Sequence, residues 1–157
     1  MKVKCDEKGI ELAVNAIKQG EIVIFPTDTV YGIGCDPYNA KAIEKIYQIK
    51  HRELKKSLPV LGYSKKELSL IAELSEKHEK IISKFWPGSL TIITKIKDEK
   101  LKKAMNLDDK IAVRVPKNDC VLKILKQCKL LVGTSANIST QDSFTDPSKC
   151  DEELKDF

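Results

Sequence analysis

The sequence contains few of the side chains that build metal centres or covalent catalytic centres. It has two histidines, and none of its five cysteines stands at C-x-x-C spacing from another. A multi-histidine metal site, a zinc site and a disulfide framework are therefore disfavoured, and we expect buried free thiols. No Ser/His/Asp or Cys/His nucleophile system is indicated. Any catalysis is expected to rest on positioning and on stabilisation of charge.

Long apolar runs are also missing. No run approaches the ~20 residues that a membrane-spanning helix requires, and the N-terminal stretch MKVKCDEKG lacks the apolar core of a signal peptide. We therefore expect a cytoplasmic protein with no membrane partner, in agreement with free thiols. Apolar residues make up 41% of the 157 residues and charged residues 32%, as in ordinary globular proteins. The length predicts a single domain over residues 1–157.

Two common nucleotide-binding signatures are absent. The chain has no G-x-x-x-x-G-K-[ST] loop, and its GIG stretch at 32–34 lacks the third glycine of a dinucleotide-binding turn. The net charge of +5 is nevertheless uneven, because residues 41–56 hold six Lys or Arg and two Glu. Such a concentration indicates a phosphate-bearing partner, either a nucleotide or RNA. A solvated helix face is the alternative explanation.

Helical and strand patterns alternate along the chain, which predicts an α/β sheet with helices packed against it. Expected caps are Ser64, paired with Glu67 in a capping box, and Asp119. The helices are expected at residues 6–20, 39–50, 64–74, 75–86 and 119–128. The strands are expected at residues 2–5, 21–25, 57–62, 89–97, 110–116 and 129–136, with 21–25 fully buried.

Polar groups gather at the ends of two of these strands. EIVIF leads into PTDTVYGIG at residues 26–34, and LLVG leads into TSANIS at residues 134–139. Ligands of open α/β sheets tend to bind at strand ends, and the glycines in each stretch would let backbone N–H groups approach a ligand. Ordinary turn chemistry is the alternative for each loop alone.

Three cations are placed where they could meet an anionic ligand. Lys50 lies beside the apolar flank of the helix 39–50 and could lean into a cleft. Arg52 follows in the loop and could grip phosphate oxygens in a forked geometry. Strand alternation puts Arg114 on the opposite face from Val113, so it could clamp a carboxylate. Dipole partners at the helix end and a solvated strand arginine are the alternatives.

Five motifs, in order, closely resemble the YrdC-like family over roughly Gly9 to Asp146: FPTDTVYGIGCDP, YQIKHRELKKSLPVL, FWPGSLTIIT, IAVRVP and VGTSANIS. The resemblance implies an α/β fold with a twisted, mixed β-sheet, packed helices and a basic concave cleft. The best-known activity of that family is that of threonylcarbamoyl-AMP synthase, a nucleotidyltransferase.

The resemblance also implies the substrates and partners. L-threonine and bicarbonate or CO₂ would give a carbamate, which attacks the α-phosphorus of ATP and releases pyrophosphate. Mg²⁺ would be carried with ATP, and no protein-bound metal is expected. A separate transferase would use the product to modify the adenosine beside the anticodon of certain tRNAs. Contact with tRNA itself is expected to be weak or indirect.

The resemblance assigns roles to individual residues. Lys50 and Arg52 match a K-x-R motif that faces the nucleotide phosphates, and both are expected to be catalytic. Five residues would bind L-threonine, with Thr27 supporting the others and Ser135 bridging threonine and nucleotide: Thr27, Thr29, Tyr31, Arg114 and Ser135. Six residues would bind ATP: Lys50, Arg52, Lys56, Asn137, Ser143 and Thr145.

This chain departs from the family pattern at several positions. Glu53, Ser57 and Ser89 stand where proline is common, and many members continue past the position of Phe157 with further strands. Ser143 and Thr145 are expected to supply part of the nucleotide wall instead. Two other functions stay open, namely an RNA-binding module of the same fold and a degenerate paralogue that binds nucleotide without turnover. The basic segment holds a single tyrosine, Tyr47, on the apolar side of its helix, which disfavours base stacking and hence the RNA module.

Overall fold

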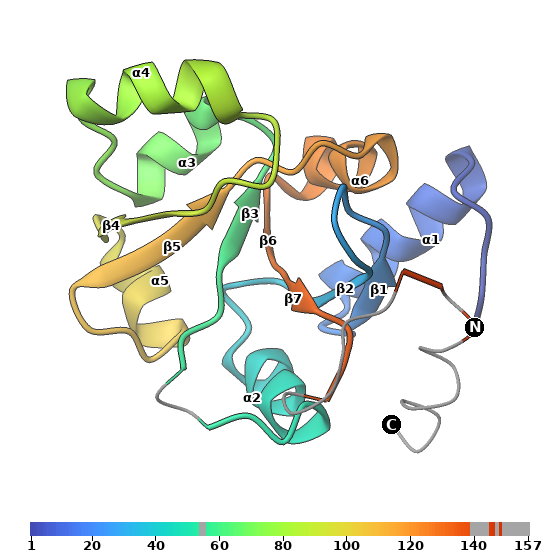
Figure 1. Ribbon diagram of the computed structural model, residues 1–157. Helices are drawn as coiled ribbons and strands as arrows, with labels where there is room; N and C mark the ends of the chain where they lie inside the picture. The colour runs from blue at the N-terminus through green and yellow to red at the C-terminus, as the bar shows by residue number, and fades with distance from the viewer. Residues whose placement is uncertain (54–55, 139–144, 147, 149–157) are drawn as a thin grey trace.

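A computed structural model of the chain describes residues 1–53, 56–138, 145–146 and 148, and in this part helices and strands alternate as expected (Figure 1). The helices are α1 (Glu7–Lys18), α2 (Ala40–Ile49), α3 (Lys65–Ile71), α4 (Glu76–Phe85), α5 (Glu99–Ala104) and α6 (Asp119–Cys128). The strands are β1 (Val23–Phe25), β2 (Gly32–Gly34), β3 (Val60–Gly62), β4 (Ile92–Lys95), β5 (Lys110–Arg114), β6 (Leu130–Val132) and β7 (Thr134–Ser135).

The strands form two sheets where the sequence predicted one. The first has the order β1-β2-β7 and is antiparallel throughout, and the second has the order β4-β5-β3-β6. The second sheet is mixed, because β3 runs parallel to β5 and antiparallel to β6. The predicted α/β class with mixed strands and packed helices is therefore confirmed, with the strands divided between two sheets.

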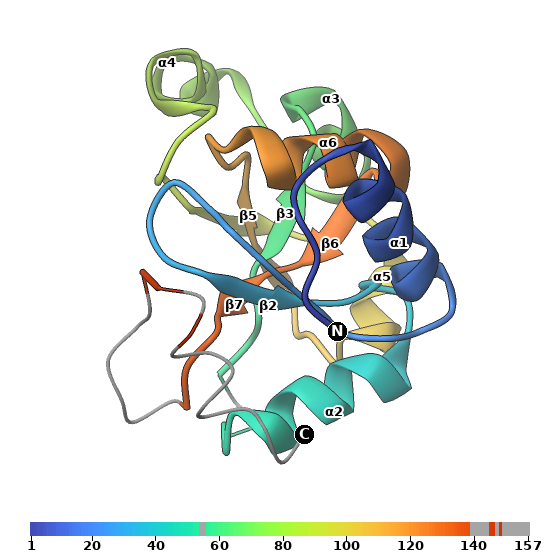
Figure 2. The same cartoon turned by 90° about the vertical axis from the view of Figure 1, so that its right-hand side faces the viewer.

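The second sheet separates two apolar cores. Successive side chains of β3 point to opposite faces, as strand geometry requires, so Val60 joins the core with α2 while Leu61 joins the core with α1 and α6. Figures 1 and 2 show α3 and α4 together at one end of this sheet, α2 at the opposite end, and α1 beside α6. The strand β5 lies beside β3, and Arg114 of β5 is paired with Leu61 of β3 in the strand register.

Helices were predicted well where apolar spacing was regular. The predicted helix 39–50 is α2, capped by the Asn39 side chain, and its apolar side is buried: Ala42, Ile43, Ile46, Tyr47 and Ile49. Asp119 is not the cap of α6, because Asn118 holds that position and accepts from the N–H groups of Cys120 and Val121. The short helix α5, capped by Asp98, was not predicted.

Two strand predictions were wrong in part, and tertiary packing explains both. The strand predicted as fully buried is β1, an edge strand in which Phe25 is buried while Ile24 is 43% exposed. The single strand predicted at 129–136 is divided at Gly133 into β6 and β7, which belong to different sheets. A side chain at Gly133 would lie 2.4 Å from Leu61 Cδ1, so any larger residue at this crossing would require the buried Leu61 side chain to move.

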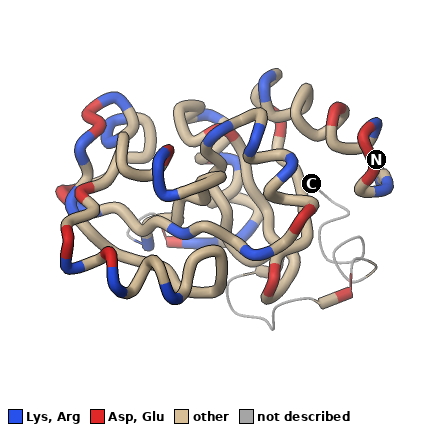
Figure 3. The backbone as a smooth tube through the Cα atoms, turned by 90° about the horizontal axis from the view of Figure 1, so that it is seen from above, with Lys and Arg blue, Asp and Glu red and all other residues tan. Residues whose placement is uncertain are grey.

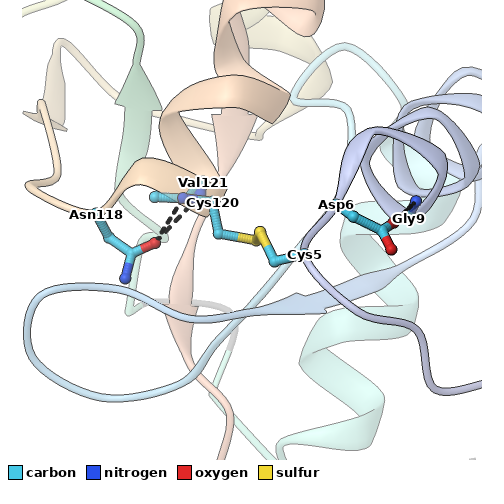
Figure 4. Close-up of a disulfide and its surroundings, with 6 residues drawn as sticks. All are labelled: Cys5, Asp6, Gly9, Asn118, Cys120 and Val121. Atoms are coloured by element: carbon cyan, nitrogen blue, oxygen red, sulfur yellow. Dashed lines mark hydrogen bonds between the residues drawn. A yellow bond between two sulfur atoms is a disulfide. The ribbon is translucent and has the colours of Figure 1, made fainter.

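The prediction for the cysteines was also wrong in part. Cys5 and Cys120 form a disulfide that ties the N-terminal segment to the first turn of α6 (Figure 4), whereas Cys35 and Cys128 are free. The segment 2–5, predicted as a strand, has no regular structure. The argument from free thiols to the cytoplasm does not apply to the Cys5–Cys120 pair, and Cys150 lies outside the described residues.

The described residues contain neither a membrane-spanning helix nor a cluster of metal-ligating side chains. None of the helices in this part of the chain is long and apolar enough to cross a bilayer. No group of three or more His, Cys, Asp or Glu side chains among the same residues is placed to hold a metal ion.

Candidate active site

A cavity of about 190 Å³ lies where the β1–β2 loop, β5 and β7 meet. It is smaller than the clefts of about 300–1,000 Å³ that hold drug-sized ligands, so it suits a small metabolite. All five residues that the sequence assigned to L-threonine line this cavity. They come from three distant parts of the chain: Thr27, Thr29 and Tyr31 from the loop, Arg114 from the end of β5, and Ser135 from β7.

Thr27 organises the β1–β2 loop. Its Oγ1 donates to the Val30 carbonyl at 2.6 Å and accepts from the N–H groups of Thr29 and Val30 at 3.2 Å each. A hydroxyl has one proton, and Thr27 gives its proton to Val30, so the Thr29 hydroxyl 3.1 Å away does not accept from Thr27. Thr29 keeps its acceptor capacity for a ligand, whereas Thr27 serves the turn.

The two hydroxyls therefore predict different mutant phenotypes. Thr27→Val removes the turn bonds, and we expect a loss of ~1 kcal/mol in the free energy of unfolding, the usual contribution of one hydrogen bond. Thr29→Val should leave the stability almost unchanged and weaken the binding of L-threonine. Denaturant unfolding and calorimetric titration of both variants would measure these effects. A Thr29→Val protein that is destabilised but binds threonine normally would assign its hydroxyl to the scaffold.

Gly32 and Gly34 belong to the strand β2, which is paired on both sides, and not to a flexible loop. Gly32 lines the cavity, so the predicted approach of its backbone to a ligand stays a prediction. A side chain at Gly34 would lie 1.9 Å from the Val132 carbonyl, and one at Gly32 would lie 2.8 Å from the Phe25 ring. Glycine is required here because the two sheets and the Phe25 ring approach β2 closely.

Arg114 is held by the protein at two of its nitrogens. Nε donates to the Gly88 carbonyl at 2.8 Å, and Nη2 donates to Asp28 Oδ1 at 2.6 Å. Strand alternation was predicted correctly, because Ile111 and Val113 are buried while Arg114 turns to the other face. The guanidinium thus stands at the cavity wall in a fixed orientation, as a carboxylate clamp requires.

The chain turn after α2 separates the two predicted phosphate-binding cations. The N–H of Arg52 bonds to the Tyr47 carbonyl and the N–H of His51 to the Gln48 carbonyl, which is the pattern of a Schellman motif. His51 adopts a φ of 47°, the left-handed conformation that this motif needs. The turn directs Lys50 inward and Arg52 toward the surface.

Lys50 is 1% exposed and connects α2 to the segment after β7. Its Nζ donates to the carbonyls of Ser135 and Asn137, the latter at 2.5 Å. The predicted position beside an apolar flank is confirmed, since the neighbouring Ile46 and Tyr47 are buried as well. Its contact with phosphate stays a prediction, since the two carbonyls take two of the three donors of the ammonium.

Burial, with a smaller contribution from the charge of Arg52, lowers the pKa of the Lys50 ammonium from 10.5 to about 8. Between these values the unfolded chain holds a proton that the folded chain has lost, so the free energy of unfolding should rise with pH. The rise is at most ~1.4 kcal/mol per pH unit. Denaturant unfolding of the wild type and of Lys50→Met at pH 7 to 10 isolates this rise. The free energy of unfolding of the wild type minus that of the variant should increase with pH. A decrease in that quantity would mean that the two carbonyls stabilise the charged form.

The remaining residues assigned to ATP are only partly brought together. Arg52 donates from Nε and Nη2 to the carbonyls of Lys56 and Ser57, so it lies beside Lys56. Lys56 forms an exposed ion pair with Glu53 at 3.8 Å. Asn137 is buried and donates to the Ile138 carbonyl, Thr145 is exposed, and Ser143 lies outside the described residues.

Asp28 is the site residue that the sequence analysis missed. It stands between Thr27 and Thr29, and its Oδ1 accepts from Arg114 and from the N–H of Lys117 at 3.0 Å. The signal was present, since a carboxylate in a loop of hydroxyls is a natural partner for an arginine. The partner itself could not be identified, because the two residues are 86 positions apart.

Comparison with known proteins gives consistent matches. The profile of the Sua5/YciO/YrdC family, described as telomere recombination, matches residues 15–157. A Methanocaldococcus jannaschii protein is 37% identical over 153 residues, which cover 94% of this chain and 70% of that protein. Threonylcarbamoyl-AMP synthase of Pseudoalteromonas translucida is 33% identical over 143 residues, covering 88% of this chain and 76% of the synthase.

A solved structure extends the match to three dimensions. Pyrococcus abyssi Sua5 complexed with L-threonine is 29% identical and superposes with a TM-score of 0.85 over 97% of this chain. The superposed region is 45% of the Sua5 chain, so this chain spans about half the length of that relative.

Proposed function

Because this chain belongs to the Sua5/YciO/YrdC family, we propose that it forms L-threonylcarbamoyl-AMP and pyrophosphate from L-threonine, bicarbonate or CO₂, and ATP. One observation carries the proposal. A small cavity combines hydroxyl groups with an arginine of fixed orientation, and the carbonyl of Ser135 at its wall accepts a hydrogen bond from the buried Lys50. The name of the P. translucida relative and the L-threonine bound to P. abyssi Sua5 support the same reaction.

The amino acid would bind with its α-carboxylate on Arg114. Thr29 and Tyr31 line the same cavity and would accept from or donate to its amine and hydroxyl. Carboxylate and guanidinium form charge-assisted bonds of fixed geometry, which orients the amine for reaction with CO₂. The protein contributes position here, and the described residues supply no covalent nucleophile at this cavity.

The nucleotide would lie on the Ser135 side of the cavity, along the segment that Lys50 supports. The carbamate oxygen attacks the α-phosphorus, a new P–O bond forms, and the bond to the β-phosphate oxygen breaks with release of pyrophosphate. Arg52, with Lys56 beside it, would meet the negative charge that develops on the phosphate oxygens. MgATP enters as substrate, and the product would pass to a separate transferase that acts on tRNA.

Pyrophosphate release tests this proposal. The purified protein should release pyrophosphate when MgATP, L-threonine and bicarbonate are all present, and omission of any one should abolish the release. Pyrophosphate formed without threonine would indicate another nucleotide hydrolysis. A folded protein that binds ATP but releases none would be the degenerate paralogue, and either result would refute the proposal.

A further inference from the structure

Asp28 and Arg114 form a shielded ion pair beside the cavity, which Arg114 lines. Their side chains are 15% (Arg114) and 16% (Asp28) exposed, and 2.6 Å separates Nη2 from Oδ1. A shielded pair is a weak source of stability, because the desolvation of both charges offsets their attraction. Its main effect is geometric, since Asp28 also accepts from the N–H of Lys117 and so pins the β1–β2 loop to the segment before α6.

The contacts of Arg114 use one edge of its guanidinium. A guanidinium can hold a carboxylate in two-bond geometry along the edge of Nε and Nη2 or along the edge of Nη1 and Nη2. The first edge is taken by the protein, with Nε on the Gly88 carbonyl and Nη2 on Asp28. The second edge retains both protons of Nη1 and one of Nη2, so a ligand carboxylate can bind Arg114 while Asp28 remains in place.

We propose that Asp28 is a positioning residue that fixes Arg114 by its Nε–Nη2 edge, presents the Nη1 edge to the cavity, and thereby selects ligands that carry an α-carboxylate. The selectivity rests on the proposed function for its ligand, L-threonine. The fixing of Arg114 rests on the contacts alone. The alternative role is competition, in which the Asp28 carboxylate takes the place of the ligand carboxylate on Arg114 and so weakens ligand binding.

Two substitutions of Asp28 and one matched control test the proposal. Asp28→Ala removes the pair, and Asp28→Asn keeps an acceptor oxygen without the charge. Asp109→Ala removes the ion pair between Lys102 and Asp109, which joins side chains that take no part in the cavity. Each protein is titrated with L-threonine, with L-threoninol, which lacks the carboxylate, and with ATP, and its melting temperature is recorded.

We expect Asp28→Ala to bind L-threonine at least ~10-fold more weakly, the size of one charged hydrogen bond. Its affinity for threoninol and for ATP should change less than ~2-fold, which is far smaller than the loss expected for L-threonine. Asp28→Asn should lie between it and the wild type, and Asp109→Ala should match the wild type. An equal loss for threonine and threoninol would assign Asp28 to the scaffold, and tighter threonine binding would make it a competitor. Either result overturns the proposal.

A second measurement does not depend on the ligand. The chain has two arginines, Arg52 and Arg114, so ¹⁵N NMR should show two arginine Nε–H signals, assigned with Arg52→Lys. The Arg114 signal should exchange slowly with solvent in the wild type and in Asp109→Ala, and fast in Asp28→Ala. Unchanged exchange in Asp28→Ala would overturn the proposal. A wild type that binds no threonine would refute the proposed function, while the exchange rates would still decide whether Asp28 fixes Arg114.

Discussion

Replacing Cys5 by serine should lower the free energy of unfolding by about 4 kcal/mol, because the disulfide to Cys120 closes a loop of more than a hundred residues in the unfolded chain. The two cysteines are 115 positions apart. Opening so long a loop restores a large conformational entropy to the unfolded state. Denaturant unfolding under non-reducing conditions would measure the loss.

Reduction and a matched variant control this result. A dithiol reductant should bring the wild type to the stability of Cys5→Ser and leave that variant unchanged. Cys128→Ser, which replaces a half-buried free thiol, should keep the sensitivity to reductant. Alkylation in denaturant should label two fewer thiols before reduction than after it. Equal labelling would show that Cys5 and Cys120 are not bonded.

Arg114→Lys should weaken L-threonine binding by ~10- to 100-fold, since the loss of charged hydrogen bonds corresponds to ~1.5–3 kcal/mol. A lysine keeps the charge but cannot hold Gly88 and Asp28 while presenting a second edge to a ligand. The affinity for ATP should remain close to that of the wild type. Calorimetric titration with each ligand would measure both affinities.

The other arginine supplies the matched control. Arg52→Lys removes the bonds to the carbonyls of Lys56 and Ser57 on the predicted nucleotide side, so it should weaken ATP binding and spare threonine. Opposite selectivity of the two variants would support separate subsites. A variant of either arginine that weakened both ligands equally would contradict this division of the cavity.

The basic segment around α2 bears on the RNA-binding alternative. Tyr47, its one tyrosine, is buried and donates to the Lys56 carbonyl, and Lys50 is buried as well. Neither is available to stack on a base or to meet a long phosphate backbone. Lys and Arg are otherwise distributed over many elements, with Asp and Glu between them (Figure 3). Weak, salt-sensitive tRNA binding stays the expectation for this surface.

Local patterns determined what could be predicted from the sequence. The apolar spacing of α2 and the cap at Ser64 act within a few residues, and both were found where the sequence placed them. The predicted capping box was wrong in part, because the Ser64 hydroxyl accepts from the N–H of Lys66 and donates to the Glu67 carboxylate. The division of strands between two sheets was not predictable, because β6 pairs with β3 and β7 with β2, which are far away in the chain. The disulfide and the Asp28–Arg114 pair were missed for the same reason, since each joins residues that are far apart in the chain.

For the site, the types and spacing of polar residues predicted the contents of the cavity but not the assignment of each bond. Thr27, Thr29, Tyr31, Arg114 and Ser135 do share one cavity. The fold of the loops determines two of these bonds. Thr27 donates its proton within the turn, and Lys50 donates to two backbone carbonyls. Such contacts depend on distances that no spacing in the sequence encodes.

The most direct test of the proposed reaction is the mass of its product after synthesis with ¹³C-bicarbonate. The protein, MgATP, L-threonine and labelled bicarbonate should yield threonylcarbamoyl-AMP that is heavier by one mass unit, with an equimolar amount of pyrophosphate. The Arg114→Lys protein should give far less product at the same threonine concentration. Pyrophosphate without the labelled adduct, or an adduct that carries no label, would contradict the proposal that this cavity joins threonine, CO₂ and the adenylyl group.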